Sequence, residues 1–341
     1  MIDNLLKQNL LPDSLIRFGI KRLLKQRLNS EHSGSVEEEK TKFMELINTL
    51  KKSPIAVNTA DANEQHYEVP TQFYQYALGK NLKYSCGYWD KSTKTLDEAE
   101  DKMLELTCKR ANIKDGESVL ELGCGWGSLT LYMAKNFPNA KITALSNSAT
   151  QREHILDEAK KLKLENVEII TADINDFSTD RKFDRVVSVE MFEHMRNYET
   201  LFNNISNWLK DNGELFVHIF SHKKYAYLFE VKDETDWMSK YFFTGGIMPS
   251  DNLLLYFAKK FEVANHWIVN GTHYQKTSEA WLSNMDKNKK SIVPLFEETY
   301  GKQNVNMWWA YWRIFFMSCA ELWGFKNGKE WFVSHYLFRK V

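Results

Sequence analysis

The sequence has no run of apolar residues long enough to cross a membrane. A spanning helix needs about 20 mostly apolar residues, and the apolar region 308–316 is interrupted by Arg313. The chain begins Met1-Ile2-Asp3-Asn4, which lacks the basic stretch and following apolar run of a secretory signal. We therefore expect a cytoplasmic protein without a transmembrane segment.

Cysteine is scarce and neither sign of charge is in excess. None of Cys86, Cys108, Cys124 and Cys319 forms a Cys-x-x-Cys pair, and no His/Cys cluster has zinc-ligand spacing. This pattern predicts reduced thiols and no metal site. Lys+Arg and Asp+Glu both number 45, and this balance disfavours nucleic acid or an anionic membrane as a partner. The sequence also contains no internal repeat and no low-complexity segment.

What the chain does have, from about residue 95, is a regular alternation of apolar strands and helical segments. Strands are expected at 118–122, 141–145, 167–171, 183–189 and 214–218, and two more at 261–269 and 331–337. Strands that alternate with helices indicate a parallel sheet covered on both faces. The prediction is an α/β, Rossmann-like fold with a mostly parallel seven-stranded sheet.

The 341 residues divide by pattern into four parts. Residues 1–65 form a helical N-terminal extension, with amphipathic spacing in 1–28 and 36–52 and a polar loop at 58–65. Residues 66–221 form the cofactor-binding α/β core. Residues 222–290 form an aromatic lid or substrate-binding insertion with one strand. Residues 291–341 supply a C-terminal helix and the last strand, which complete the core.

A glycine-rich turn follows the first strand of this core, in Glu121-Leu122-Gly123-Cys124-Gly125-Trp126-Gly127. Glycines at the end of a strand let the backbone turn sharply and approach a ligand closely. The spacing Gly-x-Gly-x-Gly differs from the Gly-x-Gly-x-x-Gly of dinucleotide-binding proteins. Glu121 is placed to meet a cationic amino-acid group, and Asp173, after the third strand, an adenine amino group. The turn therefore indicates S-adenosylmethionine, and it makes the expected α/β fold one of the Rossmann-like class I methyltransferase type.

The second strand ends without the acidic residue that many dinucleotide-binding proteins use for the ribose hydroxyls. Ser146, Asn147 or Gln151 would have to take that role here, while Ser148 suits the N-cap of the next helix. The missing carboxylate and the glycine spacing both argue against a nicotinamide-dependent dehydrogenase.

The combined motifs resemble the cyclopropane fatty-acid synthase superfamily of methyltransferases. The matching segments are Tyr84-Ser85-Cys86-Gly87-Tyr88, Leu96-Asp97-Glu98-Ala99, the glycine turn, Met191-Phe192-Glu193-His194-Met195 and His273-Tyr274-Gln275-Lys276-Thr277. Within the superfamily the chain is most similar to the coclaurine-type amine N-methyltransferases of plants. That likeness rests on Glu190-Met191-Phe192-Glu193-His194-Met195-Arg196-Asn197-Tyr198-Glu199, on Tyr311-Trp312-Arg313, on Asn327-Gly328-Lys329-Glu330-Trp331 with Ser334-His335, and on the helical extension.

The resemblance implies a set of cofactor contacts. It implies that Tyr84 and Ser85 close over S-adenosylmethionine, that Gly123 and Gly125 contact its amino-acid part, that Gln151 contacts the ribose, and that Asp173 with Ile174 contacts the adenine. It also implies that Glu193 and His194, just past the fourth strand, bind the ammonium substrate and accept its proton. Glu190 is a third candidate catalytic residue, for which a purely structural role remains equally open.

The same resemblance keeps a second chemistry open. Cyclopropane synthases use a bound bicarbonate as the base, held by residues that match Cys86, Glu193, His218 and Tyr274. Against a lipid substrate, the chain has no excess positive charge for a membrane surface, and Phe220 stands where lipid enzymes tend to carry a smaller aliphatic residue. Bicarbonate is therefore a possible second cofactor.

Aromatic residues of the lid and C-terminal part are candidates for the walls of a substrate pocket, in which an aromatic face can attract a cationic amine. They are Tyr225, Tyr227, Phe229, Trp237, Tyr241, Phe242, Trp308, Trp309, Trp312, Phe316, Trp323 and Trp331. We expect two or three of them to contact substrate, because the spacing of Trp308, Trp312, Phe315 and Phe316 is more typical of a helix core.

The sequence thus predicts a methyltransferase that N-methylates a small aromatic amine. The first alternative is methyl or methylene transfer to an unsaturated acyl chain, and the second is a non-catalytic S-adenosylmethionine-binding protein. The expected partner is a small-molecule or lipid acyl substrate, with a homodimer left open.

Overall fold

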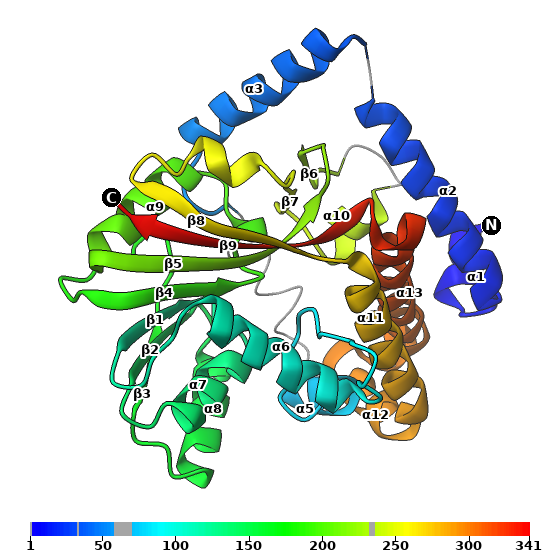
Figure 1. Ribbon diagram of the computed structural model, residues 1–341. Coiled ribbons are helices and arrows are strands. Elements are labelled where there is room, and N and C mark those ends of the chain that lie inside the picture. The colour runs from blue at the N-terminus through cyan, green and yellow to red at the C-terminus, as the bar shows by residue number, and fades with distance from the viewer. Residues whose placement is uncertain (1, 33, 58–69, 232–235) are drawn as a thin grey trace.

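The computed structural model describes residues 2–32, 34–57, 70–231 and 236–341 (Figure 1). The polar loop expected at 58–65 lies outside these ranges. The described part of the chain is built around one large sheet, with helices on both faces and a group of N- and C-terminal helices at one end (Figure 1).

The sheet has seven strands in the order β3-β2-β1-β4-β5-β9-β8. Its strands are β1 (Ser118–Leu122), β2 (Lys141–Ser146), β3 (Val167–Thr171), β4 (Phe183–Val189), β5 (Leu209–His222), β8 (Phe261–Val269) and β9 (Trp331–Lys340). The first five run parallel to one another, and β9 is antiparallel to both β5 and β8. The predicted α/β fold with a mostly parallel seven-stranded sheet is confirmed.

Consecutive residues of the central strands face opposite sides of the sheet, as a strand requires. Val187 on β4 packs toward α6 (Leu96–Arg110) and α7 (Ser128–Asn136). Val186, its neighbour, packs toward α9 (Tyr198–Trp208) and α3 (Val36–Lys52). Helix α8 (Ala149–Lys161) lies against β2 and β3. The parallel strands are therefore buried on both faces, which explains their continuous apolar sequences.

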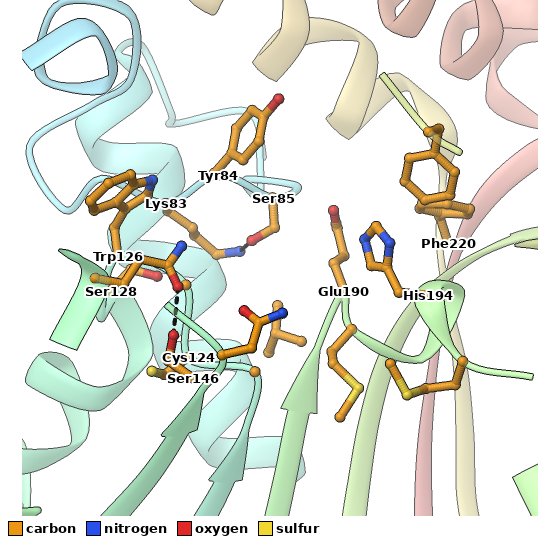
Figure 2. A pocket seen from close by; sticks show the side chains of 18 of the residues that line it. Lys83, Tyr84, Ser85, Cys124, Trp126, Ser128, Ser146, Glu190, His194 and Phe220 are labelled. Atoms are coloured by element: carbon orange, nitrogen blue, oxygen red, sulfur yellow. Dashed lines mark hydrogen bonds between the residues drawn. The ribbon is translucent and has the colours of Figure 1, made fainter. Parts of the chain in front are cut away.

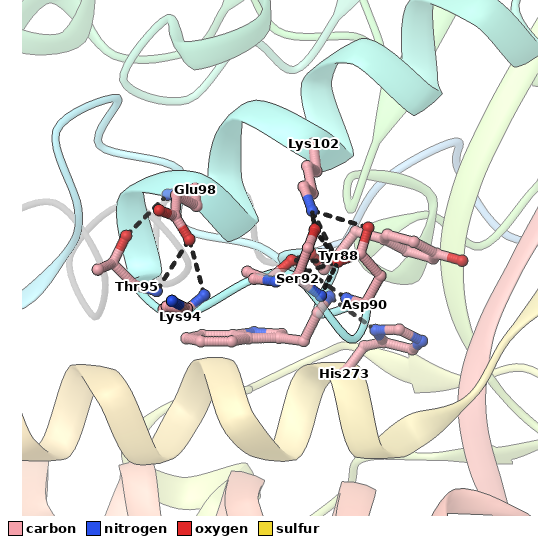
Figure 3. Close-up of polar contacts among 10 residues, drawn as sticks. Tyr88, Asp90, Ser92, Lys94, Thr95, Glu98, Lys102 and His273 are labelled. Atoms are coloured by element: carbon pink, nitrogen blue, oxygen red, sulfur yellow. Dashed lines mark hydrogen bonds and ion pairs between the residues drawn. The ribbon is translucent and has the colours of Figure 1, made fainter.

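Helix α6 begins at a capping box, in which Thr95 and Glu98 satisfy each other's backbone N–H groups (Figure 3). The turn before the helix is held by Asp90, whose carboxylate accepts hydrogen bonds from Lys102 Nζ at 2.7 Å (Figure 3). These contacts fix the start of α6 and the register of the helix, and so the position of Arg110 at its last turn.

The N- and C-terminal helices pack together beside the sheet (Figure 1). They are α1 (Ile2–Lys7), α2 (Asp13–Glu31), α5 (Thr71–Ala77), α11 (Gly271–Lys287), α12 (Lys289–Tyr300) and α13 (Val305–Gly324). Arg17 on α2 donates to Glu279 on α11 at 2.6 Å and to Glu321 on α13 at 3.0 Å. Arg313 on α13 donates to Asp13 at 2.8 Å. The N-terminal extension is therefore tied directly to the C-terminal helices.

The expected lid region contains a small two-stranded antiparallel sheet, β6 (Tyr227–Leu228) with β7 (Ile247–Met248), and the short helix α10 (Trp237–Tyr241). The region 222–290, interpreted from the sequence as an insertion with one strand, also contains a long helix. This helix, α11, begins at Gly271, where Asn270 caps it by accepting from Thr272 N at 2.9 Å. Helix α12 follows despite Pro294, because Ile292 and Phe296, four residues apart, are both buried. Tertiary packing overrides the helix-breaking residue here.

Candidate active site

A cavity of about 280 Å³ opens at the carboxyl ends of the central parallel strands. Every residue that the sequence suggested for the cofactor lines this one cavity: Tyr84, Ser85, Glu121, Gly123, Gly125, Ser146, Asn147, Gln151, Asp173 and Ile174. They come from the segment before α6 and from the ends of β1, β2 and β3. The strand order places these ends at one edge of the sheet, as expected for an open α/β fold.

The glycine turn fits a ligand that lies against the backbone. Gly123, Gly125 and Gly127 all have positive φ angles, of 76°, 52° and 82°. A Cβ atom at Gly123 would lie 2.7 Å from the side chain of Met191, whereas one at Gly125 would meet nothing within 4 Å. The turn therefore needs glycine at 123 for packing and for its backbone angle, and it leaves open space beside residue 125.

Two polar side chains, Gln151 in the first turn of α8 and Asp173 just after β3, are arranged to receive a ligand. Ser146 Oγ donates to Gln151 Oε1 at 2.8 Å, and the buried Gln151 Nε2 has no hydrogen-bond partner among the described residues. A buried donor without a partner is costly unless a ligand satisfies it. Asp173 Oδ1 accepts from Asn175 N at 2.8 Å, which fixes the carboxylate at the cavity wall. Both residues suit a nucleoside.

Glu121 is buried at the end of β1, and Thr130 Oγ1 donates to its Oε2 at 2.6 Å. Burial raises the pKa of Glu121 to about 8. Since a neighbouring cation lowers such a pKa, the carboxylate is poised to ionise when a positively charged group binds beside it. This agrees with the expected role opposite a cationic amino-acid group.

Lys83 is a cavity residue that the sequence interpretation did not identify. It is 1% exposed, and its Nζ donates to Ser85 Oγ, its one hydrogen-bond partner among the described residues (Figure 2). Burial lowers the pKa of Lys83, against the attraction of Glu190 and other acidic groups. The one available signal was a lysine directly before Tyr84-Ser85-Cys86, inside an otherwise aromatic stretch.

Glu190 stands directly after β4 with a φ angle of +50°, which is unusual for a residue other than glycine. Its N–H donates to His218 O at 2.9 Å, which holds the backbone in this conformation. The side chain lines the cavity. Its Oε1 accepts from Cys86 N at 3.0 Å and contacts His218 Nε2 at 3.1 Å, and its Oε2 accepts from Tyr274 Oη at 2.5 Å. Strained backbone of this kind concentrates at functional sites.

The resemblance implied that Cys86, His218 and Tyr274 surround bicarbonate together with Glu193. The three residues meet the carboxylate of Glu190. Glu193 lies in the short 3-10 helix η1 (Phe192–His194), is 1% exposed, and accepts from Phe220 N at 3.1 Å. Glu193 lies inside the 3-10 helix that begins two residues after Glu190, and of the two glutamates only Glu190 lines the cavity.

The remaining oxygen of Glu193, Oε2, has no hydrogen-bond partner within the described ranges. Burial, and then the nearby Glu190 carboxylate, raise the pKa of Glu193. Both influences favour the neutral form of the side chain, which does not line the cavity.

His194, in contrast, lines the cavity near Glu190. Figure 2 shows both side chains extending from the loop after β4, with Lys83 and Ser85 facing them from another segment. The His194 ring packs against Phe243 with a centroid separation of 4.7 Å. The cavity thus has an acidic group and an imidazole on one wall and an ammonium group on another.

Aromatic side chains form much of the remaining wall. Of the candidates from the sequence, Phe229 and Trp323 line the cavity, while Trp312 and Phe316 are completely buried in the helical core. Other ring-bearing wall residues include Phe243 and Trp281, which the sequence interpretation did not single out, and Phe315, which it assigned to a helix core. Phe243 follows α10, Trp281 lies on α11 and Phe315 on α13, so their place in the wall depends on how these helices pack.

Within residues 2–32, 34–57, 70–231 and 236–341, no three His, Cys, Asp or Glu side chains gather closely enough to bind a metal ion. In the same ranges, no helix combines the length and the apolar character that crossing a membrane requires.

The family model for mycolic acid cyclopropane synthetases matches residues 56–328. The chain belongs to this family. It is 42% identical over 339 residues to an (S)-coclaurine N-methyltransferase of Thalictrum flavum subsp. glaucum, which covers 98% of this chain and 94% of that protein. It is 40% identical to an (S)-coclaurine N-methyltransferase of Papaver somniferum, over 97% of this chain and 95% of that protein.

A solved structure of coclaurine N-methyltransferase bound to N-methylheliamine and SAH superposes on this chain with a TM-score of 0.96. The sequence identity is 40%, and the match covers 99% of both chains. The family, these relatives and the cavity at the ends of the parallel strands identify the chain as an S-adenosylmethionine-dependent methyltransferase. The predicted enzyme class and the resemblance to the coclaurine-type members of the family are confirmed.

Proposed function

We propose that this enzyme transfers a methyl group from S-adenosylmethionine to the nitrogen of a small aromatic amine. The observation that carries the proposal is the Glu190 carboxylate, which is ringed by hydrogen-bond donors and exposed to an aromatic cavity. A carboxylate offers about four acceptor positions, and three are engaged here. The fourth faces the cavity, where it suits the N–H of an ammonium substrate.

The cofactor, when bound, supplies a methyl group on a sulfonium, which needs little further activation. The chain's task is to align the amine and to remove its proton. In our proposal Glu190 orients the ammonium group, and His194, on the same wall, accepts the proton. Phe229, Phe243 and Phe315 exclude water and attract the cation, at roughly 0.5–2 kcal/mol per well-placed ring.

For the cofactor we propose four contacts at three separate points of the cavity. Gln151 Nε2, which lacks a partner among the described residues, donates to a ribose hydroxyl. Asp173 accepts from the adenine amino group. Lys83, buried and held by Ser85, binds the carboxylate of the amino-acid end, while Glu121 ionises against its ammonium. The buried ammonium group of Lys83 needs a counter-charge such as the cofactor carboxylate, because desolvation of the ammonium alone costs several kcal/mol.

We also propose that the enzyme works without bicarbonate. The backbone N–H of Cys86, the hydroxyl of Tyr274 and His218 Nε2 already contact Glu190. We infer that the carboxylate of Glu190 stands where the resemblance led us to expect bound bicarbonate. Transfer to an acyl chain would then lack the bicarbonate that serves as its base.

The test is an assay with methyl-deuterated S-adenosylmethionine and two substrate panels, followed by mass spectrometry. One panel contains benzylic, phenethyl and cyclic secondary amines that bear an aromatic ring, and the other contains monounsaturated phospholipid vesicles. We expect labelled N-methyl products from the first panel only. Label in the acyl chains, with none in the amines, would overturn the proposal, and cofactor binding without turnover on either panel would support a non-catalytic role.

A further inference from the structure

A line of polar side chains connects the surface end of α6 to the Glu190 carboxylate. His218 on β5 and His335 on β9 are direct cross-strand partners, and Trp267 on β8 is paired with His335 on its other side. Residues paired in this way project from the same face of a sheet. The three rings therefore form a row across the antiparallel half of the sheet, with His218 at the cavity end.

Arg110, the last residue of α6, closes the outer end of this row. Its guanidinium carbon lies 5.0 Å from the centre of the Trp267 ring, and its Nη1 lies 2.9 Å from His335 Nδ1. His335 Nε2 lies 2.9 Å from His218 Nδ1, and His218 Nε2 lies 3.1 Å from Glu190 Oε1. Four side chains are thus linked in series from half-buried Arg110 to the cavity.

The direction of every hydrogen bond in this series follows from its first member. A guanidinium has only donors, so His335 Nδ1 accepts. A neutral His335 then carries its proton on Nε2 and donates to His218 Nδ1. Because His218 Nδ1 accepts this hydrogen bond, the neutral His218 ring carries its proton on Nε2 and donates to Glu190.

Both histidines are neutral, which this sequence of bonds requires. They are completely buried, and burial lowers the pKa of each well below its usual value. The charge of Arg110 lowers both further, and Lys83 acts in the same direction. Neither ring can take up a second proton without placing a buried cation beside Arg110.

We propose that Arg110 is a positioning residue for methyl transfer: acting through His335 and His218, it fixes one ring tautomer in both histidines, so that an N–H always points at Glu190 and keeps that carboxylate ionised. The inference rests on the proposed N-methyltransferase activity, since it assigns Glu190 to the orientation of the ammonium substrate. Without the guanidinium, His335 can turn its proton to Nδ1, and His218 is then free to present a bare nitrogen to Glu190.

The charge of Glu190 depends on several opposing influences. Burial raises the pKa of Glu190, and Lys83, the Tyr274 hydroxyl and the Cys86 N–H oppose the rise. Other ionisable groups act on members of the series: Glu193 and Cys319 face Glu190, His266 acts on His335, and Tyr88 acts on Arg110. Loss of the His218 donor removes one of the interactions that favour the ionised form, so the pKa of Glu190 rises.

The first measurement is the pH dependence of kcat/KM with an accepted amine. In Arg110→Met we expect the acid limb to move up by roughly one pH unit, with S-adenosylhomocysteine affinity unchanged. Arg110→Lys keeps a charged hydrogen-bond donor at this position. Its acid limb should therefore lie between that of Arg110→Met and that of the wild type. Arg339→Met is the matched control, because this guanidinium on β9 pairs with Glu262 and Glu214 outside the series, and its profile should equal that of the wild type.

The second measurement needs no substrate. Ring-nitrogen NMR of protein labelled with ¹⁵N-histidine reports which nitrogen of each ring carries the proton. The chain has nine histidines, so the signals lost in His335→Phe and in His218→Phe assign the two rings. We expect Nε2-protonated rings in the wild type and mixed protonation in Arg110→Met. Unchanged ring signals, or an acid limb that stays in place in Arg110→Met, would overturn the proposal. If no amine is methylated by the wild type, the proposed function fails, while the ring signals still decide whether Arg110 sets the tautomers.

Discussion

Tyr274 on α11 donates a 2.5 Å hydrogen bond to the carboxylate of Glu190, which follows β4. The contact joins the helical part of the molecule to the parallel sheet at the point where we place the substrate nitrogen. The hydroxyl of Tyr274 makes this hydrogen bond, while the ring makes a separate stacking contact with Trp323 at a centroid distance of 4.8 Å. The hydrogen bond can therefore be removed without removing the packing contact.

Tyr274→Phe keeps the ring and removes only the donor. We expect kcat/KM for the amine to fall roughly 10- to 100-fold, the range for a lost hydrogen bond to a charged group, and the acid limb of the pH profile to move upward. The reason is that Glu190 loses a donor that favours its ionised form. Steady-state kinetics across pH measure both effects. Tyr256→Phe, which removes a hydroxyl bound to Lys40 on the surface, should match the wild type.

His194→Ala tests the proposed proton acceptor. Turnover should drop at least about tenfold, because a positioned base contributes about 10²–10⁴-fold, while calorimetric affinity for S-adenosylhomocysteine stays near the wild-type value. His266→Ala, on the surface beside Asp251, is the control. Unaltered turnover in His194→Ala would show that the ring only fills space beside Phe243.

Lys83→Met tests the counter-ion of the cofactor carboxylate. S-adenosylhomocysteine should bind roughly 10- to 100-fold more weakly, because a charge-assisted hydrogen bond is lost. A decarboxylated analogue should bind the wild type and the variant equally weakly. Lys80→Met, which alters an exposed pair with Asp101, is the matched control. If the variant still distinguishes the two ligands as strongly as the wild type does, Lys83 does not contact the carboxylate.

Gly123→Val should abolish cofactor binding, because the new side chain would collide with Met191 in a backbone conformation that valine avoids. The control is Gly116→Val, since Gly116 also has a positive φ angle but a Cβ atom added there would meet nothing within 4 Å. Calorimetry with S-adenosylhomocysteine, together with a melting curve for each variant, separates the local collision from general strain. Equal binding losses in both variants would contradict the explanation.

Removal of bicarbonate should leave methyl transfer unaffected. Assays in carbon dioxide-free buffer, with and without added bicarbonate, should give the same turnover with an amine substrate. Stimulation by bicarbonate would mean that the Glu190 carboxylate gives up its donors to an external anion, contrary to the arrangement proposed above.

The sequence predicts the local parts of this molecule well. The strands of the sheet, the helix Val36–Lys52 and the glycine turn rest on short-range signals, namely hydrophobic periodicity, caps and glycine spacing. Tyr84, Ser85 and Ile174, in contrast, were expected at the cofactor only from the family resemblance. Glu190 was harder to interpret than Glu193, because their three-residue separation gives no hint that only the first faces the cavity. Lys83, Phe243 and Arg110 depend on contacts between distant segments, which periodicity and spacing do not encode.

The position of β9 between β5 and β8 has a consequence for how the enzyme is made. Ribosomal synthesis delivers residues 331–340 after every other strand, yet β5 and β8 depend on them for their shared edge. Until residues 331–340 have been made, His218 lacks its cross-strand neighbour His335. The nascent chain then contains the residues of the cofactor site but not the complete set of side chains that leads to Glu190. The residues at the ends of β1, β2 and β3 are therefore made well before the strand that completes the row of side chains leading to Glu190.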